Sequence, residues 1–217
     1  MATIRTDLGL SRLVNFSDAS VAIALTLLVL PLVDIAPEIA KPEGVGTLFT
    51  EHWSAFLAFA ISFAVIARFW VVHHRVFDWV VGYTPPIVWI NFVWLASIVF
   101  LPFATNVLSY SPTNDRGVYV LYIGTLILTS GSMLLMEVVL KRTPELLLPE
   151  AQQDLDVSRS VIATGMFVVA LILAVVFPTV GMFWLLLLLL TGLVRRLLGR
   201  LFPSLTTRSG AESAGDR

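Results

Sequence analysis

Long apolar segments separated by short polar ones dominate the pattern of this chain. A helix of about 20 residues crosses the hydrocarbon core of a bilayer. Pro178 and Gly181 divide the last apolar stretch, which as one helix would be roughly 55 Å long and therefore too long for a single crossing. The pattern predicts an all-α integral membrane protein with six transmembrane helices per subunit, over residues 12–33, 47–72, 87–108, 117–140, 161–177 and 181–198.

Composition agrees with this prediction and excludes several classes of protein. Of the 217 residues, 57% are hydrophobic and only 13% are charged, and the mean hydropathy is +0.88. A soluble domain needs a more charged surface. No basic patch with interleaved aromatic residues indicates a nucleic-acid partner. The chain has no cysteine, which excludes disulfides and thiolate metal sites.

The distribution of basic residues predicts the topology. With six spans, 12 of the 14 Lys and Arg residues fall on one side, and only Lys41 and Arg116 fall on the other. Basic loops stay on the cytoplasmic side, so both termini are expected there. The first apolar segment has no small-residue cleavage site and is expected to be retained. The expected domains are a cytoplasmic lead (1–11), a six-helix transmembrane domain (12–201) and a disordered cytoplasmic tail (202–217).

The first apolar segment carries a stripe of large side chains. On a helical wheel, Ile23, Leu27 and Leu30 share one edge, Phe16 lies close to the same line, and Thr26 lies next to it. Such a stripe is more often a surface for helix packing or lipid contact than the lining of a pore. The stripe alone therefore leaves both interpretations open.

Asp18 lies at the mouth of the same segment, about 140° around the helix from the stripe. An ionisable group at this depth is costly unless it has a partner, and it often marks function. If the stripe faces an aqueous path, the carboxylate faces neighbouring helices and has a structural role. Several residues are expected at the same depth and are candidate partners of Asp18: Arg12, which reaches it if the helix begins at Ser11, and Arg68, His73, His74 and Asn91.

Other polar residues give little support for metal binding or catalysis. His73 and His74 are adjacent, so on a helix they point about 100° apart, and no HExxH motif is present. No GxSxG motif or glycine-rich phosphate loop occurs either, so an enzyme is not expected. Glu137 is interpreted as an interfacial residue, and Trp94 is expected to pack between helices. Near the span ends, Trp53, Trp70, Trp79, Trp89 and Trp184 are expected to form aromatic belts.

The opening motif resembles a known family. Arg12, followed by Phe16, Ser17 and Asp18, is similar to the RxxxFSD signature of the potassium channels called transmembrane protein 175. That family includes lysosomal channels with two six-helix repeats and prokaryotic homologues with one. Because FSD occurs once here, the chain resembles the single-repeat prokaryotic form. The resemblance implies a homotetramer with four first helices around a central pore, and no TVGYG filter.

The resemblance also implies roles for individual residues. Ile23, Leu27 and Leu30 would form an apolar constriction with Thr26 beside them. The helix would be held by a network of polar and aromatic residues: Arg12, Phe16, Ser17, Asp18, His73, His74 and Asn91.

The function expected from this resemblance is a passive, potassium-preferring cation channel in a prokaryotic cytoplasmic membrane. Potassium is the permeating ion, and no cofactor is expected. The alternative is a secondary transporter that uses Asp18 and the histidines for proton coupling. It ranks second because broken, inverted-repeat spans are not evident in the sequence. A membrane enzyme or an assembly scaffold has no positive feature in its favour.

Overall fold

The structure, a computed structural model, describes residues 7–37, 44–111 and 115–179. Within these ranges, five helical segments are long and apolar enough to cross a membrane. The all-helical membrane fold and the first five expected spans are therefore confirmed, whereas the predicted span 181–198 and tail 202–217 lie outside the described residues. The long helices are α1 (Asp7–Leu27), α4 (Trp53–Phe77), α5 (Pro85–Tyr110), α6 (Arg116–Arg142) and α8 (Ser158–Val176).

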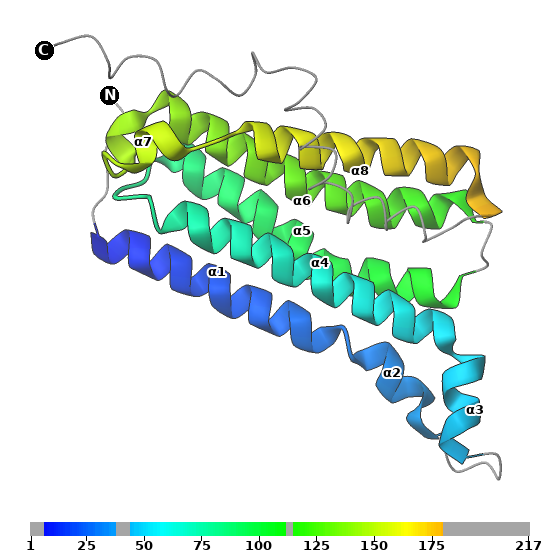
Figure 1. Ribbon diagram of the computed structural model, residues 1–217. Coiled ribbons are helices and arrows are strands. Elements are labelled where there is room, and N and C mark those ends of the chain that lie inside the picture. Colours follow the sequence, from blue (N-terminus) through cyan, green and yellow to red (C-terminus); the bar gives the residue numbers. More distant parts are fainter. Residues whose placement is uncertain (1–6, 38–43, 112–114, 180–217) are drawn as a thin grey trace, which may run out of the picture.

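The five long helices lie side by side in a bundle with α5 at its centre (Figure 1). Helix α5 packs against α1, α4 and α6, and α6 in turn packs against α8. Trp94, Ile98 and Leu101 of α5 are fully buried, in agreement with the interior position expected for Trp94. Because α1 and α8 lie on opposite sides of the bundle, α1 leaves much of its own surface uncovered within one subunit.

The first span is longer at its start than predicted and is broken near its end. Helix α1 begins at Asp7, so Ser11 lies inside the helix and cannot begin it as expected. After Leu27 the chain turns and a short helix, α2 (Leu30–Ile35), follows. Pro31 occupies the first turn of α2, where its missing N–H needs no helical acceptor. The hydroxyl of Tyr110 on α5 donates to the carbonyl oxygen of Pro31 at 3.3 Å.

The second span is shifted from its predicted bounds. A separate short helix, α3 (Gly44–Glu51), ends before His52, and α4 begins at Trp53 instead of residue 47. Helix α4 then continues to Phe77, five residues beyond the predicted end. His73 and His74 therefore lie within the last turns of α4 and not beyond the helix, which places His73 against α5.

Two connections meet at one end of the bundle and form what we call the end cap, residues 78–84 and 143–157. The second connection contains the 3-10 helix η2 (Pro144–Leu146) and the short helix α7 (Ala151–Asp154). An antiparallel bridge pairs Val80 with Leu147. It includes hydrogen bonds of 2.9 Å from the Val81 N–H to Leu146 and from the Leu148 N–H to Trp79. Because Val80 and Leu147 are buried, this end of the bundle is closed by packed backbone.

Hydroxyl groups join the helices in the interior. Thr105 of α5 donates to Ser62 of α4 at 2.8 Å, and Ser62 is 2.9 Å from the hydroxyl of Tyr122 on α6. Thr129 of α6 donates to Ser97 of α5 at 2.9 Å. Polar groups at membrane depth need partners inside the protein, and hydroxyl pairs of this kind link helices whose other contacts are apolar.

Glu137 of α6 is buried, so its interpretation as an interfacial residue is wrong. Its side chain is 5% exposed, and Ser160 of α8 donates to Oε1 at 2.8 Å. The second oxygen, Oε2, is buried and has no hydrogen-bond partner among the described residues. The sequence did not reveal this because the position of α8, which supplies Ser160, depends on the fold of the preceding connection.

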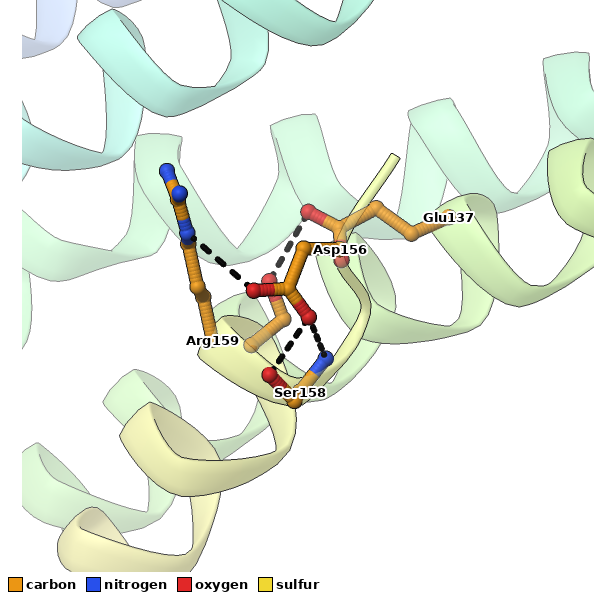
Figure 2. Close-up of polar contacts among 5 residues, drawn as sticks. Glu137, Asp156, Ser158 and Arg159 are labelled. Atoms are coloured by element: carbon orange, nitrogen blue, oxygen red, sulfur yellow. Dashed lines mark hydrogen bonds and ion pairs between the residues drawn. The ribbon is translucent and has the colours of Figure 1, made fainter. Parts of the chain in front are cut away.

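Asp156 lies two residues before α8, beside this carboxyl (Figure 2). It accepts hydrogen bonds from the backbone N–H of Ser158 at 3.1 Å and from the Ser158 hydroxyl, and the guanidinium of Arg159 is 3.4 Å away. Partial burial favours the protonated form, but the hydrogen bonds from Ser158 and the charge of Arg159 outweigh it and lower the pKa of Asp156. This carboxylate therefore caps the first turn of α8.

Candidate ion pathway and the network behind it

Helix α1 has two faces of different character. Val21 and Ala24 of α1, and Leu28 directly after it, are buried against the bundle. Two residues of the predicted stripe, Ile23 and Leu27, are 60% and 37% exposed on the other side of the helix. The predicted stripe thus points away from the subunit's own core.

The remaining stripe residues differ in their surroundings. Leu30 is 50% exposed, but it belongs to α2 and not to α1. Thr26 is exposed, and its hydroxyl donates to the carbonyl oxygen of Ile23 at 2.7 Å. Phe16 is 54% exposed and meets the ring of Phe92 on α5 edge-on, with centroids 6.1 Å apart. Over residues 22–27, the exposed side chains of α1 are therefore apolar apart from Thr26, whose hydroxyl is bonded to the helix backbone.

Behind this face, a chain of hydrogen bonds joins α1, α5 and α4. The Ser17 hydroxyl donates to the Leu13 carbonyl oxygen at 2.9 Å, and Asn91 Nδ2 donates to Ser17 Oγ at 3.0 Å. Asn91 Oδ1 lies 2.8 Å from His73 Nε2. Because Oδ1 can only accept, His73 must carry a hydrogen on Nε2. The structure brings together three of the residues expected in the network.

The His73 ring is held from both sides. It stacks on Phe77 and on Trp94, with centroids 4.4 and 4.1 Å apart. The side chains of His73 and Asn91 are fully buried. Within the described part of the chain, His73 Nδ1 and Trp94 Nε1 have no hydrogen-bond partner. Among the described residues, the hydrogen bond from His73 Nε2 to Asn91 Oδ1 is thus the one polar contact of the ring, and it fixes the orientation of the side chain.

Asp18 is bonded to a residue that was not among its expected partners. The indole nitrogen of Trp70 on α4 donates to Asp18 Oδ1 at 2.9 Å. Trp70 lies three residues before His73 and therefore on the same face of α4, a spacing that could have indicated the contact. The sequence analysis assigned Trp70 to the aromatic belt instead.

The other expected members of the network lie outside it. Arg12 and Arg68 are exposed, and neither has a hydrogen-bond or ion-pair partner among the described residues. His74 stacks on the outer side of Trp70, with centroids 5.2 Å apart, and its Nε2 is 3.9 Å from Asp78 in a pair that is about half exposed. No group of three or more His, Asp or Glu side chains that could hold a metal ion occurs in the described ranges.

Comparison with known proteins shows which sequences and structures this chain resembles. The family model of the endosomal/lysosomal potassium channel TMEM175 matches residues 12–102, which include the whole hydrogen-bond chain. This part of the chain is therefore similar to the TMEM175 family. The chain is also similar to two proteins named potassium channels: one from Streptomyces collinus, 32% identical over 109 residues, and one from Chamaesiphon minutus, 37% identical over 98 residues.

The extent of these matches differs between sequence and structure. The alignments cover 50% and 45% of this chain, which spans about half the length of each bacterial relative (52% and 48%). The human endosomal/lysosomal proton channel TMEM175 is 28% identical over 111 residues, which are 50% of this chain and 21% of that protein. The crystal structure of a lysosomal potassium-selective channel TMEM175 homolog from Chamaesiphon minutus has the same fold. Its TM-score is 0.73 at 24% identity, and the match covers 87% of this chain and 98% of that one.

Proposed function

We propose that this protein is a passive, potassium-preferring cation channel whose pore is surrounded by the α1 helices of four copies. The observation that carries the proposal is the orientation of α1. Val21, Ala24 and Leu28 anchor the helix to its own bundle, while Ile23 and Leu27 point outward. Four such faces around a common axis would bury the stripe against itself and surround a narrow apolar path.

The chemistry of this path follows from its side chains. Large apolar residues can close a pore by excluding water, and they discriminate between ions by the hydration that each ion must lose. Ile23, Leu27 and Leu30 would form the constriction, with Thr26 beside it. The bonds from Asn91 to Ser17 and from Trp70 to Asp18 would hold α1 in place from behind. Potassium would be preferred moderately, because the path has no ring of backbone carbonyls.

The membrane and the topology are part of the same proposal. The protein would lie in the cytoplasmic membrane of a prokaryote with both termini in the cytoplasm, as the distribution of 12 of the 14 basic residues indicates. The end cap would then face the cytoplasm, since Lys141 and Arg142 precede its second connection.

Flux measurements on purified protein in liposomes test the proposal. With an outward potassium gradient, we expect passive potassium flux that exceeds sodium flux. Leu27→Ala should widen the constriction and weaken the preference for potassium. Ile172→Ala is the matched control, because Ile172 is 56% exposed on α8, on the other side of the bundle.

Three results would each contradict one part of this proposal: the position of the pore, passive conduction, or the pore shared between copies. If Leu27→Ala and Ile172→Ala both behave like the wild type, the pore lies elsewhere. Flux that saturates and is driven by a pH gradient would instead support the proton-coupled transporter. Native mass spectrometry of the solubilised protein tests the subunit number separately, and a monomer would exclude a pore shared between copies.

A further inference from the structure

Gly9, in the first turns of α1, lies against the tip of Tyr83 in the end cap. A Cβ atom built on Gly9 would be 2.4 Å from the Tyr83 hydroxyl oxygen and 3.1 Å from the ring atoms Cε1 and Cζ. Real Cβ atoms essentially never come within 3.0 Å of another heavy atom, so a Cβ at this position would force Tyr83 or the start of α1 to shift. By contrast, Cβ atoms at Gly124, Gly131 and Gly165 would meet nothing within 4 Å.

Tyr83 is itself fixed in place. It is half-buried and packs against the hydrophobic core of the bundle. It follows the segment Trp79–Val81, which is hydrogen-bonded to residues 146–148 of the second connection. Leu10, next to Gly9, is buried in the same core. The start of α1 therefore rests on a rigid surface and not on a freely moving loop.

We propose that Tyr83 is a positioning residue for the pore helix, acting through its contact with Gly9. This inference rests on the proposed function, because it requires that α1 lines the pore. The contact sets the distance between the start of α1 and the bundle. The network at Ser17, farther along the helix, holds α1 at a second point. Together the two points define the tilt of α1 and hence the position of Leu27.

The geometry gives the size of the effect. Gly9 is about 12 Å along the helix from Ser17, and Leu27 is about 15 Å beyond Ser17, at 1.5 Å per residue. An added methyl at Gly9 must move by roughly 1 Å to reach an ordinary contact distance from Tyr83. If α1 pivots at Ser17 and its buried contacts with the bundle rearrange, Leu27 moves by a similar amount in the opposite direction, toward its own bundle. Four such movements would widen the constriction by roughly 2 Å.

A graded set of variants tests this mechanism in liposomes. Gly9→Ala should raise potassium flux several-fold and lower the preference for potassium over sodium. Adding Tyr83→Phe removes the hydroxyl but leaves ring atoms at 3.1 Å, so it should restore wild-type behaviour in part. Adding Tyr83→Ala should restore it fully. Gly124→Ala is the control, because a methyl there meets no neighbour. Unchanged or lower flux in Gly9→Ala, or an increase that persists with Tyr83→Ala, would overturn the proposal.

A second readout does not depend on conduction. Because the chain has no native cysteine, Leu27→Cys gives a single attachment site for a spin label in each copy. Distances between labels should lengthen by roughly 2 Å when Gly9→Ala is added and return with Tyr83→Ala. If the labels lie close together but the distances between them do not change with Gly9→Ala, the role of Tyr83 is overturned and the shared pore is not. The absence of any short distance between copies would overturn the shared pore and this inference with it.

Discussion

Replacement of Asn91 by leucine should test the hydrogen-bond chain behind α1 most directly. Asn91 is fully buried and makes two side-chain bonds, to Ser17 Oγ at 3.0 Å and to His73 Nε2 at 2.8 Å. Leucine has a similar volume but no polar atoms, so Asn91→Leu removes both bonds without leaving a large cavity.

The two lost bonds have unequal consequences. Ser17 keeps its bond to the Leu13 carbonyl oxygen, so its hydroxyl stays satisfied. The Nε2–H of His73 would be buried between two aromatic rings with no acceptor, and such an orphaned donor costs about 1–3 kcal/mol. We expect the free energy of unfolding to fall by about 1–3 kcal/mol, mostly because of His73.

Chemical unfolding in detergent micelles, followed by tryptophan fluorescence, measures this loss. Asn106→Leu is the matched control, because Asn106 lies near the other end of α5, is only half-buried, and has no hydrogen-bond partner among the described residues. The double variant Asn91→Leu with His73→Phe removes both partners and keeps the ring stack, so it should recover most of the lost stability. If Asn91→Leu is as stable as Asn106→Leu, or if His73→Phe fails to rescue it, the reasoning is refuted.

Three further changes test other contacts. Trp70→Phe removes the donor to Asp18, which is only partly buried, and should lower the free energy of unfolding by about 1 kcal/mol in the same assay; no loss would mean that water replaces the indole. Ser160→Ala leaves Glu137 without its donor and should destabilise by about 1–3 kcal/mol, whereas Ser160→Thr should not. Asp156→Asn tests pH dependence: because its folded pKa is lowered from 3.8, the carboxylate stabilises the wild type above about pH 4, and that contribution is lost as the pH falls. Protection factors for hydrogen exchange in the first turn of α8, which correct for the pH dependence of intrinsic exchange, should therefore decrease below about pH 4 in the wild type but stay constant in the variant.

Much of the fold could be predicted because membrane helices are specified by hydropathy over long windows. The interruptions could not, since they depend on single residues. The predicted span 12–33 places Pro31 inside a helix, but Pro31 lies in the first turn of a new one, because proline fits a first turn better than a helix interior. The break at His52 has no proline or glycine at that position, and only the packing of α3 and α4 reveals it.

The hydrogen-bond partners at the candidate site were harder to predict from the sequence than the membrane spans. The wheel of α1 placed the stripe on one edge and Asp18 on another, but a wheel cannot name the partner across a helix interface. Opposite charges suggested Arg12, while the structure has the neutral donor Trp70 at 2.9 Å from Asp18. At membrane depth, a neutral N–H satisfies a carboxylate oxygen without bringing a second charge out of water.

The break between α1 and α2 divides the stripe into two mechanical parts. Ile23 and Leu27 move with α1, whereas Leu30 moves with a separate short rod that α5 holds through the bond from Tyr110 to the Pro31 carbonyl oxygen. A movement confined to the Tyr110 end of α5 would therefore reposition Leu30, while the bond from Asn91 to Ser17 continues to hold α1. The constriction would then consist of two successive layers along the pore, and the position of each layer could change independently.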